Sequence, residues 1–158
     1  MSKEYIIALK ESLEKKLKVL DETYRICQMQ FDIISGNDPD YDEFDRLFDD
    51  KEICIEKLSK LDEGFEIVYA RVSEELKSNS GDYTEIIAQM KGLITQITEV
   101  STSISALEER IRNSVSDALI RERKGIADTK RSVNVAMNYY KNMTGTGIPD
   151  SMYMDKKK

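Results

Sequence analysis

Apolar residues recur at alternating intervals of three and four along most of the chain, and this spacing restricts the fold more than any other feature. It places apolar side chains on one face of a helix and is typical of heptad seams. The first series is Ile6, Leu13, Leu20, Cys27 and Ile34, with Leu17, Tyr24 and Phe31 between them. The second is Phe44, Phe48, Ile55, Leu58, Leu61, Phe65, Val68, Val72 and Leu76. The third is Ile86, Met90, Leu93, Ile97, Val100, Ile104, Leu107 and Ile111. We therefore predict three long helices, over residues 3–34, 40–77 and 83–142.

Two short breaks, at residues 35–39 and 78–82, separate these stretches. Short connections between long helices favour antiparallel neighbours whose seams pack against one another. The chain of 158 residues is about one domain by length. The predicted fold is all-α, an elongated antiparallel three-helix bundle of coiled-coil character over residues 1–142. Residues 143–158 contain Gly145, Gly147 and Pro149, and we expect them to form a flexible tail.

Composition limits the classes of partner. The net charge is -6, which argues against nucleic acid, because phosphate contacts need an excess of Lys and Arg. No stretch approaches the roughly 18 apolar residues of a membrane span, so we expect no membrane insertion. Neither a signal peptide nor a disulfide between Cys27 and Cys54 is expected, and both expectations favour a cytoplasmic protein.

Catalysis has little support in the sequence. The chain contains no His, so the commonest general base and metal ligand is missing, and neither Cys has a His to activate it. We expect no enzyme activity and no cofactor. The acidic run over residues 38–45 has carboxylates at the first, third and fifth positions of a possible calcium loop. Glu43 stands where such a loop needs Gly, so a helix N-terminus is favoured and no metal site is expected.

Several segments together resemble the FlgN-type flagellar export chaperones. They are the helix start Asp-Tyr-Asp-Glu-Phe at residues 40–44, Lys51-Glu52, Lys57-Leu58, the Tyr- and Gly-bearing stretch 140–145, and Asp-Lys-Lys at 155–157. The resemblance implies a chaperone that binds the disordered C-terminal segments of hook–filament junction (hook-associated) proteins and delivers them to the type III export gate. It also implies that Tyr140, or Tyr139, contacts the export gate. Two alternatives stay open: a related filament-cap chaperone, and a structural coiled-coil adaptor or spacer.

The client site is expected in the C-terminal half of the third helix, residues 113–140. A third helix antiparallel to the second reaches the far end of the hairpin near residue 120, so later residues extend beyond their neighbours. The seam also changes after Ile111, because its next heptad positions are Ser114, Ala118, Arg121, Gly125, Asp128 and Ser132. We interpret these residues as unable to fill a dry core. A shifted apolar stripe is predicted to bind the partner: Val115, Leu119, Ile126, Val133, Met137 and Tyr140. Its charged rim is predicted to be Arg121, Arg123, Lys130 and Arg131.

Overall fold

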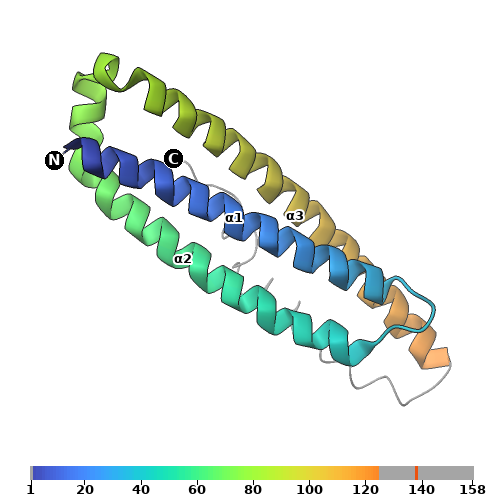
Figure 1. Cartoon of the computed structure of the whole chain (residues 1–158). Coiled ribbons are helices and arrows are strands. Elements are labelled where there is room, and N and C mark those ends of the chain that lie inside the picture. The colour runs from blue at the N-terminus through green and yellow to red at the C-terminus, as the bar shows by residue number, and fades with distance from the viewer. Residues whose placement is uncertain (1, 125–137, 139–158) are drawn as a thin grey trace.

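The computed structural model describes residues 2–124 and residue 138, and in them the chain forms an elongated all-α bundle (Figure 1). Helix α1 spans Ser2–Ile34, α2 spans Tyr41–Ser78 and α3 spans Thr84–Lys124. One 3-10 turn, η1 (Ser80–Tyr83), precedes α3. The predicted fold class is confirmed, and the predicted bounds of the first two helices agree within one residue. Apart from residue 138, the predicted continuation over residues 125–142 and the tail 143–158 lie outside the described residues.

Helix α1 lies between the other two helices and packs along both of them (Figure 1). It runs antiparallel to α2, while α3 returns in the same direction as α1. The backbones of α2 and α3 approach each other much less closely than either approaches α1. Consequently α1 is the central helix, and contacts between α2 and α3 depend on side chains long enough to span the gap.

The apolar seams form the core, but not to the same depth on each helix. The seven-residue series of α1 is buried throughout: Ile6, Leu13, Leu20, Cys27 and Ile34. On α3 the buried seam residues are Met90, Ile97, Ile104, Leu107 and Ile111. On α2 they are Phe44, Phe48, Leu58 and Val72, whereas Ile55, Phe65, Val68 and Leu76 are only partly buried. Each fully buried aliphatic or aromatic side chain contributes about 1.5–3 kcal/mol, so the C-terminal half of α2, where only Val72 is buried, is the least stabilised part of the seams.

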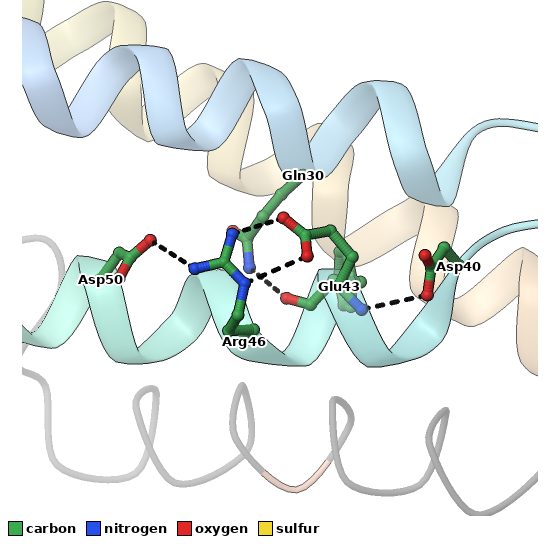
Figure 2. Close-up of polar contacts among 6 residues, drawn as sticks. Gln30, Asp40, Glu43, Arg46 and Asp50 are labelled. Atoms are coloured by element: carbon green, nitrogen blue, oxygen red, sulfur yellow. Dashed lines mark hydrogen bonds and ion pairs between the residues drawn. The ribbon is translucent and has the colours of Figure 1, made fainter.

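The acidic run begins α2 as a capped helix N-terminus (Figure 2). The Asp40 carboxylate accepts a hydrogen bond from the backbone N–H of Glu43 at 3.1 Å, and Arg46 Nε donates to the Glu43 carboxylate at 3.0 Å. Gln30 Nε2 on α1 donates to the backbone carbonyl of Phe44 at 3.1 Å, which ties the end of α1 to the start of α2. The sequence-based choice of a helix N-terminus over a calcium loop is therefore confirmed at Asp40. A cap of this kind contributes about 1 kcal/mol.

Candidate functional site

The first two residues of the predicted partner-binding stripe lie in the bundle itself. Val115 is fully buried in the main core, and Leu119 is partly buried against it. Ala118, which we expected to be too small for a core position, is also fully buried. The expectation that the seam ends at Ile111 is therefore wrong. Side chains at the start of α2 still cover α3 at this level, because the Tyr41 hydroxyl reaches Glu122, one turn beyond Ala118.

The exposed part of the predicted surface begins at the last turns of α3. The Ile120 side chain is 52% exposed, and Arg121 and Arg123 of the predicted rim are both exposed. At this level the Tyr41 hydroxyl, at the start of α2, donates to Glu122 Oε2 at 3.1 Å. The pKa of the Tyr41 hydroxyl is raised to about 12. Burial is the largest cause, and the hydrogen bond to Glu122 is the second. The contact places the end of the hairpin opposite residue 122, close to the predicted position near residue 120.

The rest of the predicted site cannot be placed. Outside the described residues lie Ile126, Val133, Met137 and Tyr140 of the stripe, Lys130 and Arg131 of the rim, and the alternative gate residue Tyr139. The structure therefore brings Ile120, Arg121 and Arg123 together at the end of the bundle. It neither joins them to, nor separates them from, the later part of the stripe.

Sequence reasoning missed a buried polar cluster that joins all three helices. Lys51 Nζ on α2 donates to both carboxylate oxygens of Glu108 on α3, at 3.0 and 2.9 Å. The Cys27 thiol on α1 donates to Glu108 Oε2 at 3.6 Å. Lys51 is 0% and Glu108 5% exposed, so this charge pair is withdrawn from water. The cluster provides one of the side-chain contacts that bridge the gap between α2 and α3.

The spacing of the sequence contained the signal for this cluster. Lys51 lies seven residues after Phe44 and seven before Leu58, which makes it a seam position of α2. Glu108 belongs to a buried row at seven-residue spacing, with Ser101 before it and Val115 after it. A charged residue at a seam position on each of two helices could have predicted a buried ion pair.

The two cysteines are thiols enclosed in the bundle. Cys27 and Cys54 are both free and buried, as the rejection of a disulfide predicts. Burial raises the pKa of the Cys27 thiol to about 12, against the opposing influence of the nearby Lys51 ammonium. The thiol therefore acts as a hydrogen-bond donor and a small apolar group, because a reactive cysteine requires the thiolate.

The net negative charge is concentrated on one helix. Helix α2 carries 12 acidic and 6 basic residues, whereas α1 and α3 each carry 6 of either sign. In the described part of the chain, no group of three or more Cys, Asp or Glu side chains is placed to hold a metal ion. None of the described helices is long and apolar enough to cross a membrane.

Comparison with known families gives an independent result for the chain as a whole. A family model described as FlgN protein matches residues 1–136, which include all three described helices. No curated protein and no solved structure matches the chain.

Proposed function

Because this chain belongs to the FlgN family, whose members act as flagellar export chaperones, we propose that it binds hook-associated proteins in the cytoplasm and delivers them to the type III export gate. The clients are the hook–filament junction subunits, and the segments bound are their disordered C-termini. The protein acts by binding alone and uses no cofactor.

One observation supports this proposal above the others. Where α3 reaches the end of the hairpin, Ile120, Arg121 and Arg123 are all exposed. The chain continues for 34 residues beyond Lys124, and the sequence repeats apolar residues there at intervals of seven, four and three: Ile126, Val133, Met137 and Tyr140. We assign the client segment to this stripe.

The burial of Val115 and Leu119 divides the predicted stripe into two parts. We assign these two residues to anchoring α3 on the bundle, because their side chains already contribute to its core. The client contacts are assigned to Ile126, Val133 and Met137, with Arg121, Arg123, Lys130 and Arg131 as the charged rim. Tyr140, or Tyr139, is assigned to the export gate.

Such a site suits a client that must be released again. A disordered amphipathic segment exposes apolar surface that tends to aggregate, and a helical partner covers it. Ordering the segment costs free energy, which lowers the affinity and makes transfer possible. The basic rim favours a client with acidic flanks and mainly affects the rate of association.

The proposal is tested by titrating purified C-terminal segments of hook-associated proteins into the full chain in a calorimeter. Ile126→Asp and Val133→Asp should each weaken binding at least tenfold, because a carboxylate replaces an apolar contact. Thr102→Asp, at an exposed position of α3, is the matched control and should bind as the unmodified chain does. Unchanged affinity in both stripe variants would refute the assigned site.

The same titration separates the client classes. A filament-cap C-terminal segment that binds more tightly than every hook-associated segment would support the alternative chaperone type. If no flagellar segment binds at millimolar concentration, where an interaction of only about -4 kcal/mol is detected, the chaperone assignment fails and a structural spacer is favoured.

A further inference from the structure

A shallow groove lies between α1 and α2, at a place with no assigned function. It measures about 470 Å³ and is lined by Lys15, Lys18, Val19, Glu22, Lys57, Lys60 and Leu61. Val19 and Leu61 provide apolar surface from the two helices. The lysine stems add further apolar surface while their ammonium groups remain in water. The groove is therefore an apolar strip with charged edges.

The charge of this groove is opposite to that of the protein. Four of its lining residues are lysines and one is a glutamate, whereas the chain has a net charge of -6. The excess of acidic residues on α2 makes this local reversal more pronounced. Lys57 and Glu22 form an ion pair across the groove with an N–O distance of 4.0 Å, which is weak. The lysine ammonium groups are consequently able to pair with carboxylates of another molecule.

A second heptad stripe follows the α2 side of the groove. Ile53, Lys57, Lys60, Gly64 and Ile67 succeed one another at intervals of four, three, four and three, and all are exposed. The two isoleucines are 52% and 62% exposed. A Cβ added at Gly64 would meet no atom within 4 Å, so the surface there is open. The stripe runs over the 15 residues 53–67, which span about 21 Å or four helical turns.

We propose that the groove between α1 and α2 binds an acidic amphipathic helix of a partner protein. The apolar face of that helix, with residues at intervals of three and four, packs on Val19, Leu61, Ile53 and Ile67. Its flanking Asp and Glu side chains pair with the lysines on both edges. The site is separate from the client site at the end of α3.

Charge argues against the protein's own C-terminal segment as the occupant. Residues 125–158 contain 6 basic and 3 acidic residues, so they share the sign of the groove. The apolar strip also favours a protein helix over a small anion, which would gain nothing from contact with it. A second copy of this chain and an anionic membrane are the remaining occupants, and the experiment distinguishes both from a partner helix.

The probe is a labelled synthetic peptide of about four helical turns, with Leu at the a and d positions and Glu at the flanking positions. Its binding to the full chain is measured by fluorescence anisotropy. The Lys18→Glu/Lys60→Glu variant should bind at least tenfold more weakly, and high salt should weaken binding to the unmodified chain. Lys77→Glu/Lys91→Glu, which reverses two exposed lysines elsewhere, is the matched control and should change the affinity less than twofold.

Several outcomes would overturn the proposal. They are no binding of the acidic peptide, equal binding of a peptide with Lys in place of Glu, or equal loss in both double variants. A dimer in sedimentation that Lys18→Glu/Lys60→Glu dissociates would assign the groove to a second copy. Vesicles containing phosphatidylserine that bind the unmodified chain but not this variant would assign it to a membrane. Hook-associated segments should still bind the variant, and loss of that binding would contradict a separate site.

Discussion

Replacing Lys51 by Met tests whether the buried cluster behaves as a true ion pair. Lys51 Nζ lies 2.9 and 3.0 Å from the two Glu108 oxygens and 5.1 Å from the centroid of the Phe48 ring. At an effective dielectric constant of about 20, the attraction between the two charges is about 5 kcal/mol. Methionine fills a similar volume but leaves the Glu108 carboxylate buried without its ammonium partner.

The uncompensated carboxylate sets the size of the loss. Lys51→Met should lose about 3–4 kcal/mol at pH 7, in the range for breaking a buried ion pair by removing one partner.

The assay is urea unfolding followed by circular dichroism at pH 7. Lys77→Met, at an exposed position of the same helix, is the control and should change stability by less than about 0.5 kcal/mol. Lys51→Met/Glu108→Met removes both charges and should recover most of the loss, because no uncompensated charge remains. A loss below about 1 kcal/mol would refute the reasoning.

Further predictions concern the core, one half-buried carboxylate and the thiols. Leu107→Ala should cost about 2–5 kcal/mol, and Phe65→Ala should cost less than Phe44→Ala, because Phe65 is only partly buried whereas Phe44 is fully buried; equal urea midpoints for the two Phe variants would contradict this order. Burial raises the pKa of Asp45 to about 6, and its Oδ1 meets no hydrogen-bond donor in the described residues. The unmodified chain should therefore gain stability as the pH falls from 7 towards 4, and Asp45→Asn should gain on the order of 1 kcal/mol at pH 7 after allowance for partial exposure; a variant less stable than the unmodified chain at pH 7 would disprove it. Cys27 and Cys54 should resist alkylation at pH 8 until the chain unfolds, because burial raises the pKa of both thiols; rapid labelling of the folded protein, measured by mass spectrometry, would contradict their burial.

The heptad spacing was sufficient to predict the helices and much of the core. Ile6, Leu20 and Ile34 occupy the buried face that their seven-residue spacing predicts, and the breaks between the first three helical segments were also located. The periodicity did not fix how α3 rotates. We assigned Val115 to a partner, but the structure buries it in the main core together with Ala118.

The sequence alone determined which segments are helical, because helix periodicity and capping depend on residues only a few positions apart. It also predicted the family, which a family model over residues 1–136 confirms. Only the tertiary structure decided that α1 is the central helix, that Glu108 meets both Lys51 and Cys27, and that lysines of two helices surround one apolar groove. Those contacts join residues 39 or more positions apart, and their partners depend on how each helix is rotated and shifted against the next. A heptad pattern identifies the face that is buried but does not specify what it is buried against.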